Sequence, residues 1–159
     1  MKGMSIFNDV KELAGGSKKS KDWYRSQVFY GLEDNRGFKP GDVIFFNYAA
    51  ATKNLPYYDK YPMVLITDVD MQNLQFSGGN LHYLRPTTRM SVARSWGGGS
   101  TSYPRRCYHK YFMSNASNIK SVSTTDLRDM KFPLPLEQFT MNVVGRYLDV
   151  PSSIIWSRQ

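Results

Sequence analysis

Cys107 and His109 are the first candidates for chemistry, because a thiolate is a nucleophile and an imidazole can activate it. Arg105 and Arg106 stand just before the cysteine, and their positive charge would favour a thiolate. No cysteine-protease motif surrounds the pair, however, and residues two apart point in different directions on a helix. We therefore interpret Cys107 as an ordinary cysteine.

Metal and phosphate sites have equally little support in the sequence. Neither His82 nor His109 stands at a zinc-binding spacing. Asp68 and Asp70 share one face of a predicted strand end and suit a hard cation, but no third acid stands nearby. The glycine run at 97–100 lacks the Gly-Lys-Ser/Thr of a phosphate-binding loop. The sequence thus predicts no metal, no cofactor and no catalytic set, and we expect a protein that is not an enzyme.

The formal net charge is +8 and is unevenly distributed, because no Asp or Glu occurs between Met71 and Thr125. Arginine predominates among the cations of this acid-free stretch, and its planar guanidinium suits bidentate contacts with phosphate or carboxylate. A solvated basic surface is one interpretation, and a contact surface for an acidic protein or a nucleic acid is the other. For the second we predict these binding residues: Arg85, Arg89, Arg94, Arg105, Arg106 and Lys110.

Aromatic residues are interleaved with these arginines. Rings beside cations form stacking platforms for single-stranded nucleic acid, and Trp96 and Tyr103 are the candidates to stack on bases. Neither an RNA-recognition motif nor a zinc-finger spacing accompanies them, so the same rings are also consistent with a core.

The segment LPYYDKYP, residues 55–62, holds a second set of candidates. Its prolines stiffen both ends, and Tyr57, Tyr58 and Tyr61 offer large contact areas at a low entropy cost. The acid and the lysine between them are interpreted as a turn pair. Three neighbouring rings flanked by charges do not all face inward. We therefore predict an interface loop in which at least one tyrosine packs against another chain or against the segment 132–139.

Three predicted strands position this segment, because residues 41–49, 61–70 and 74–84 are apolar runs bounded by proline, glycine or turn residues. Gly78-Gly79 interrupts the third run and predicts a bulge or a close backbone approach. The short spacing favours a mainly β fold of the α+β class. We expect a small SH3-like antiparallel barrel or bent sheet over residues 39–84, with short peripheral helices and an extended C-terminal segment.

Helical spacing marks residues 5–14, with Ser5 as a possible N-cap and Gly15-Gly16 as the stop. A basic, flexible connector follows. The helix is therefore interpreted as an arm that docks on a neighbour, so that residues 1–21 precede a single β-rich domain, 22–159.

The remaining elements are assigned from spacing alone. Residues 22–32 fit either a helix or a strand. Residues 87–96 and 104–114 fit short helices, 118–124 fits a strand, and 132–139 is predicted to be extended.

Localisation follows from what the sequence lacks. No apolar run approaches the roughly 20 residues that span a bilayer, so no membrane span is predicted. The first residues lack the apolar core of a secretory signal, and one cysteine forms no intrachain disulfide. These features favour a cytoplasmic protein or one assembled in a cytoplasm.

Several motifs stand out in the chain: PGDVIFFNY, LPYYDKYPMVLI, GGNLHYLRP with Arg89, PRRCYHKY and PLPLEQF. In these motifs the chain resembles a family of tailed-bacteriophage (myovirus-type) proteins of unassigned function. The resemblance implies either a virion part or an accessory of DNA metabolism. The leading hypothesis is a non-enzymatic structural subunit of the tail, baseplate or neck, located in the virion, assembled in the host cytoplasm and bound to other phage structural proteins. The alternative is a DNA- or RNA-binding accessory of replication, recombination or packaging.

A second resemblance concerns GDVIFFNY and YPMVLITD. In these two pieces the chain is similar to ribonuclease toxins of the MazF/PemK kind. Tyr61 stands where such toxins have an arginine before the proline, so a residue that they use in catalysis is missing. The resemblance therefore implies a shared barrel type rather than a shared reaction.

Overall fold

The computed structural model describes residues 5–35, 37, 39–49, 57–89, 91, 107–123, 126–127, 137, 139–143 and 146–157. In chain order its elements are α1 (Ile6–Ala14), α2 (Lys21–Gly31), β1 (Val43–Tyr48), β2 (Tyr57–Asp59), β3 (Met63–Asp70), β4 (Gln75–Asn80), the 3-10 turn η1 (Leu81–Tyr83), β5 (Tyr108–Phe112), the 3-10 turn η3 (Met113–Asn115), β6 (Ala116–Ser121), β7 (Phe139–Val143), β8 (Arg146–Val150) and α5 (Ser152–Ser157).

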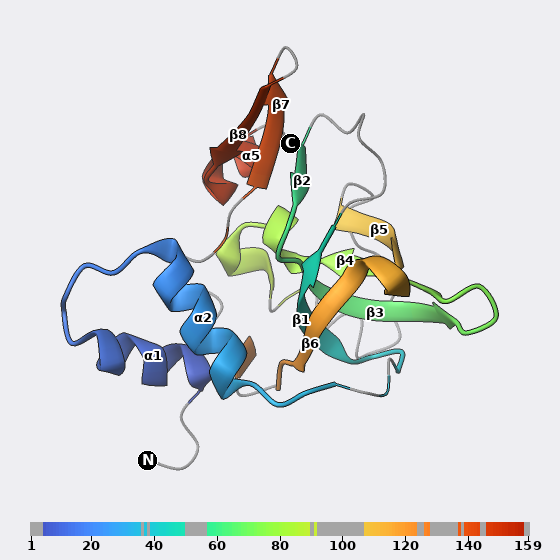
Figure 1. Ribbon diagram of the computed structural model, residues 1–159, viewed down its shortest axis with the longest axis horizontal. Helices are drawn as coiled ribbons and strands as arrows, with labels where there is room; N and C mark the ends of the chain where they lie inside the picture. The colour runs from blue at the N-terminus through green and yellow to red at the C-terminus, as the bar shows by residue number, and fades with distance from the viewer. Residues whose placement is uncertain are drawn as a thin grey trace.

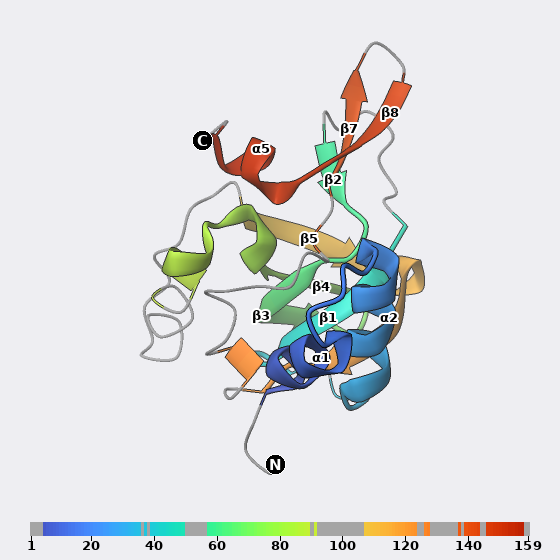
Figure 2. The ribbon, with the colours of Figure 1, turned by 90° about the vertical axis from the view of Figure 1, so that its left-hand side faces the viewer.

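The strands form two antiparallel sheets (Figure 1). A five-stranded sheet has the order β5-β4-β3-β1-β6, and a three-stranded sheet has the order β2-β7-β8. The small sheet projects beyond the large one, and α1 and α2 lie together along one side of the large sheet (Figures 1 and 2). The prediction of a mainly β, α+β fold is confirmed in its bent-sheet form, because the described strands do not close into a barrel.

Strand β1, which lies between β3 and β6, is buried on both faces over its first four residues, and this explains why its sequence is continuously apolar there rather than alternating. Val43 and Phe45 belong to the larger core cluster, which includes residues of both N-terminal helices. Ile44 and Phe46 belong to a second cluster on the other face of the sheet. Gly78 has the close backbone approach predicted for it, since a Cβ there would lie 2.2 Å from a backbone oxygen of β3.

Helix α1 begins and ends as its sequence predicts. The hydroxyl of Ser5 accepts a hydrogen bond from the backbone N–H of Asn8 at 3.1 Å, and Gly15 ends the helix with φ of 58°. Phe7 and Val10 are buried in the larger core cluster. The helix therefore packs on its own chain, and the interpretation of a separate docking arm is wrong. The next segment, left open between helix and strand, is the helix α2.

The prediction of a helix at 104–114 is wrong for the described part of that range, because residues 108–112 form the strand β5. Tyr111 points into the core while Tyr108, Lys110 and Phe112 are exposed, and this period of two is that of a strand. The strand predicted at 118–124 is confirmed as β6. Most of 87–96 and 132–139 lies outside the described residues, although residues 86–89 are helical.

Candidate nucleic-acid interface

Arg89 is the clearest departure from the predicted binding residues, because its side chain is only 1% exposed. Its guanidinium donates to Glu137 Oε2 at 2.8 Å and to the backbone oxygens of Leu81 and Leu84 at 2.8 and 3.1 Å. An arginine whose donors are used inside the fold does not contact an external phosphate in this conformation. Its assignment to the binding surface is therefore corrected to a structural role.

Of the other predicted cations, the structure describes Arg85 and Lys110. Arg85 is exposed just before a helical turn, and Lys110 is exposed on β5, an edge of the large sheet. Lys110 lies close enough to the carboxylate of Asp70 to contribute to lowering its pKa, after the hydrogen bonds from the side chain and backbone of Asn73. The remaining candidates, together with Trp96 and Tyr103, lie outside the described residues: Arg94, Arg105 and Arg106.

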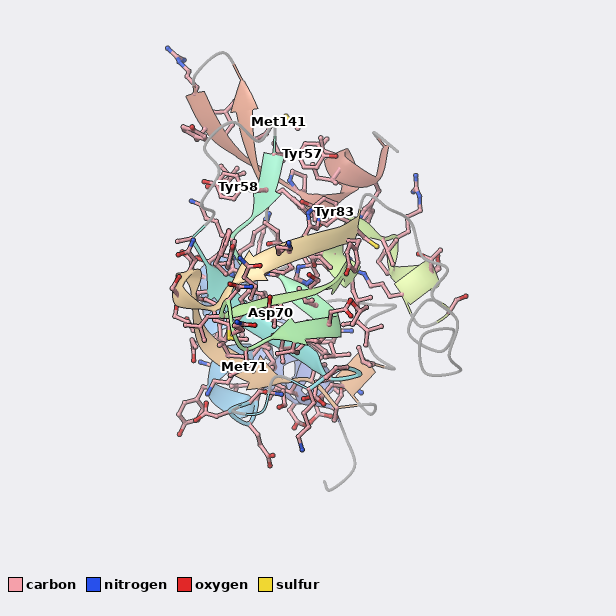
Figure 3. The ribbon with its side chains drawn as sticks, turned by 90° about the vertical axis from the view of Figure 1, so that its right-hand side faces the viewer. Tyr57, Tyr58, Asp70, Met71, Tyr83 and Met141 are labelled. Carbon is pink, nitrogen blue, oxygen red and sulfur yellow. The ribbon has the colours of Figure 1, made fainter. Side chains whose placement is uncertain are left out.

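The segment that carries Tyr57, Tyr58 and Tyr61, here called the tyrosine segment, has side chains on two sides of the strand β2. Tyr57 and Tyr58 project from opposite sides of β2 (Figure 3). The Tyr57 ring lies 6.0 Å from the ring of Tyr83 and 6.4 Å from that of Phe139, a residue of the segment predicted to receive a tyrosine. All three tyrosines are half-buried. Whether any of them also meets another chain stays a prediction.

Asp59, which the sequence analysis interpreted as one half of a turn pair, is only 5% exposed. One carboxylate oxygen lies 2.8 Å from Nδ1 of His82 and accepts a hydrogen bond from Asn80 at 3.1 Å. The other oxygen accepts from the backbone N–H of Tyr61 at 2.9 Å. This carboxylate therefore fixes the tyrosine segment to the large sheet.

A buried polar network occupies the junction between the two sheets. We call it the junction network, and it consists of two hydrogen-bonded groups, one of Asp59, Asn80 and His82 and one of Arg89, Glu137 and Ser152.

Glu137 accepts three hydrogen bonds in this network, two from Arg89 and one from Ser152. Burial by itself would raise the pKa of Glu137, but the charge of Arg89, the nearby His82 and hydrogen bonds from Arg89 and Ser152 outweigh it and hold the pKa below its ordinary value. Trp156 of α5 closes the network by donating to the backbone oxygen of His82 at 3.0 Å. Because its charges are paired and bonded, the network stabilises the fold rather than offering a site.

Two adjoining hollows of about 550 and 450 Å³ lie where α2, the end of β1, the tyrosine segment and β6 meet. In Figure 1 this is the region where α2 approaches β6. The hollows share Asn47 and Tyr61, and together we call them the tyrosine groove. The side chains that matter on its walls are Arg25, Tyr30, Asn47, Tyr58, Lys60 and Lys120.

Two cations of the groove are already held in place. Arg25 stacks over the ring of Tyr61 at 3.7 Å and contacts Asp22 at 2.7 Å, and Lys120 contacts Asp34 at 2.6 Å. Both carboxylates are largely exposed, at 90% and 60%. The cations themselves are largely buried, with side-chain exposures of 5% for Arg25 and 15% for Lys120, so these two pairs hold the groove walls in place rather than presenting a charge to a phosphate.

Four other groups on the groove walls have no partner among the residues that the structure describes. They are the rings of Tyr30 and Tyr58, the side-chain amide of Asn47 and the ammonium of Lys60. The oxygen of the Asn47 amide is buried, which makes its lack of a hydrogen bond unusual. Rings, an amide and a cation on one surface are the side chains that bind bases and phosphates.

Sequence reasoning missed Arg25 and Asn47 altogether and gave Lys60 only a turn role. Arg25 lies on a helix and Asn47 at the end of a strand, with no motif around either residue. Only the packing of α2 against the large sheet brings them together. No local signal in the sequence could have found this groove.

Within the ranges given above, no three His, Cys, Asp or Glu side chains are grouped so that they could hold a metal ion. None of the helices in those ranges is long and apolar enough to cross a membrane.

The fold and the groove define a small, basic α+β protein with an aromatic and cationic surface of the kind that contacts nucleic acid. The family model of the phage T4 terminal DNA protecting protein matches residues 5–136, well over half of the chain, and the chain belongs to this family. No curated protein and no solved structure gives a match.

Family membership confirms that this is a phage protein, as the resemblance implied, although it does not test the particular motifs. The leading hypothesis, a structural subunit of the tail, baseplate or neck, is wrong, because the family is one of DNA protection. The alternative, a DNA-binding phage accessory, fits the family better. Partners among the phage structural proteins are likewise not supported.

Proposed function

We propose that this protein binds the ends of linear phage DNA and shields them, and that it acts by binding rather than by catalysing a reaction. The match to the terminal DNA protecting family over residues 5–136 is the observation that carries the proposal. The net charge of +8 supports it, since a polyanion is the partner that such a charge attracts. The virion, with assembly in the host cytoplasm, remains the proposed location.

The tyrosine groove is the proposed contact surface. Lys60 supplies a cation along it, and the exposed Lys18 and Lys19 precede α2, one of its walls. The cations contact the sugar–phosphate backbone and give affinity without sequence preference. The groove is a surface for DNA in general, as protection of an end requires.

Preference for an end follows from the unpartnered rings and amide. Inside a duplex the base faces are stacked and unavailable, whereas the last pair of an open end exposes a base face and can fray. Tyr30, Tyr58 and Asn47 therefore gain contacts at an end that the middle of a duplex does not offer. This difference is the proposed source of end recognition.

The cations that the sequence singled out have a secondary place in this proposal. Arg85, together with Arg94, Arg105 and Arg106, adds long-range attraction to the DNA. Lys110, on the edge strand β5, adds to this attraction in the same way.

Two assays test the proposal. In the first, an open linear duplex and a dumbbell of the same sequence with closed ends compete for the protein, and the open duplex should win. In the second, bound protein should slow digestion of the open duplex by a double-strand exonuclease. Lys60→Glu should weaken both effects, whereas Lys39→Glu, the same charge reversal at an exposed lysine outside the groove, should not.

Two kinds of result would contradict the proposed function. Equal affinity for dumbbell and open duplex would show a DNA-binding protein without end preference. No binding at about 50 mM salt, or an affinity independent of salt, would remove DNA as the partner.

A further inference from the structure

We propose that the smaller hollow, bounded by Asn47, Tyr58 and Lys60, seats one unpaired nucleotide at the end of a DNA strand. The inference rests on the proposed function and deepens it, because it names the feature of the end that is recognised. The hollow has a volume of about 450 Å³, within the range of roughly 300–1,000 Å³ found for small-molecule sites.

The walls of this hollow are fixed before any ligand binds. The backbone N–H of Tyr48 donates to the oxygen of Lys60 at 2.8 Å, which ties the tyrosine segment to the end of β1. On the other side, the N–H of Ala49 donates to the oxygen of Asn115 at 3.0 Å. Tyr58 itself pairs with Thr140 of β7. A preformed site loses less entropy on binding than a loop that must first become ordered.

Tyr58 supplies the stacking surface. Its ring lines the hollow and has no ring contact or hydrogen bond to any residue in the described ranges. Tyr48 also lines the hollow, but it is held at 5.1 Å by the ring of Tyr111 and so forms a fixed wall. One base can therefore stack on Tyr58, as bases stack on aromatic residues in single-strand binding proteins.

Asn47 supplies the contact to the edge of the base. The register of β1 against β6 shifts between Phe45 and Asn47, and such bulges re-aim a side chain next to a site. The amide lines both hollows and has no hydrogen bond within the described part of the chain. Because the amide oxygen is buried, the contact assigned to Asn47 is donation from its side-chain N–H groups to an acceptor on the edge of the base.

Lys60 completes the site with a cation for the phosphate of the seated nucleotide. Its ammonium has no carboxylate partner among the described residues, whereas the guanidinium of Arg25 and the ammonium of Lys120 each have one. A base that is paired within a duplex cannot reach Tyr58 or Asn47, since its faces are stacked and its edge is bonded. Only an overhanging or frayed nucleotide fits the three groups together.

The test uses DNA hairpins with one open end that differ only at that end. One has a blunt end clamped by G·C pairs, one a short 3′ overhang and one a short 5′ overhang, and a closed dumbbell completes the set. Fluorescence anisotropy with the full chain should show at least one overhang bound about tenfold more tightly than the clamped blunt end.

The variants place that preference at the hollow. Tyr58→Ala and Asn47→Ala should each remove most of the overhang preference, whereas Tyr58→Phe, which keeps the ring, should retain it. Tyr147→Ala removes an exposed tyrosine of β8 outside the groove and is the matched control. Thermal melting of every variant confirms that it is folded.

Three results would count against the proposals, and they differ. If open ends bind better than the dumbbell but overhang and clamped blunt end bind equally, the nucleotide seat is excluded and the proposed function stands. If the overhang preference survives in Tyr58→Ala and Asn47→Ala, the seat lies elsewhere and this assignment is overturned. If the dumbbell binds as well as every open end, end recognition itself fails.

Discussion

The junction network and the tyrosine groove are built from the same short segment, yet they differ in one decisive respect. Asp59 points into the junction, where it is bonded to Asn80 and lies within hydrogen-bonding distance of His82. Lys60 lines the groove and has no side-chain partner among the residues described. Buried polar groups in proteins are normally paired, so a paired cluster reflects the needs of the fold. Unpaired groups that share a hollow instead indicate a ligand.

The largest expected effect is a loss of stability when the junction network is broken. Arg89→Ala leaves Glu137 as a buried carboxylate without its cation, which typically costs about 3–5 kcal/mol of stability. Lys110→Ala, at an exposed cation of the same acid-free stretch, should change stability by less than about 0.5 kcal/mol. Denaturant unfolding of both variants measures the contrast. A loss below about 1 kcal/mol for Arg89→Ala would mean that the network is not a stabilising element.

The second largest expected effect is the pH dependence of the stability that the Arg89–Glu137 pair contributes. The folded-state pKa of Glu137 lies below its ordinary value of 4.5, so its stabilisation is complete above that pH and is lost as the pH falls through the folded-state pKa. Glu137→Gln should therefore be less stable than the wild type by about 2 kcal/mol at neutral pH. The gap should narrow below pH 4.5.

Thermal melts of both proteins from neutral to acidic pH measure this gap. Glu33→Gln, a change at an exposed carboxylate, is the control. A gap that is independent of pH would show that ionisation of Glu137 does not contribute.

These two regions also show which parts of the molecule a sequence can predict. The strands β1 and β3 and the helix α1 follow from local signals: proline and glycine before an apolar run, a serine at the helix start and a glycine after its end. Arg89 and Glu137 are 48 residues apart, and nothing near either residue predicts the other. In the sequence, Arg89 is one more arginine of a basic stretch.

The error at β5 has a related cause. The five residues of β5 mix aromatic with polar and charged types without a strict alternation and fit a helix or a strand, and here pairing with β4 decides the outcome. The groove could not be predicted for the same reason, because Arg25 and Lys120 meet only after α2 has packed on the sheet. The tyrosine segment was recognised from its composition, whereas its division between two regions depends on the side of β2 from which each residue projects.

Tyr57 and Tyr58 allow that division to be tested within one strand. Tyr57→Ala removes a ring that packs against Tyr83 and Phe139, and because the ring is half-buried we expect a loss of about 1–3 kcal/mol of stability. Tyr58→Ala removes a ring without such contacts, so stability should change by less than about 0.5 kcal/mol while DNA-end binding weakens. Melting and anisotropy on the same two proteins give the comparison. If both variants lose stability and neither loses binding, the tyrosine segment belongs to the core alone.

The smallest expected effect is on the salt dependence of DNA binding, and it concerns two lysines that both lie among aromatic residues. Lys60 lies in the groove beside Tyr58 and Tyr61 and has no carboxylate partner in the described ranges, whereas Lys110 lies on β5 near Asp70. A lysine that contacts a phosphate releases a counterion on binding, so its removal lowers the slope of log affinity against log salt by roughly 0.9 for duplex DNA. Lys60→Ala should show this decrease without a change in stability, and Lys110→Ala should show a smaller one because Lys110 is not among the residues that line the groove. Binding titrations at several salt concentrations measure both slopes. If Lys110→Ala lowers the slope and Lys60→Ala does not, the DNA lies across β5 rather than along the groove.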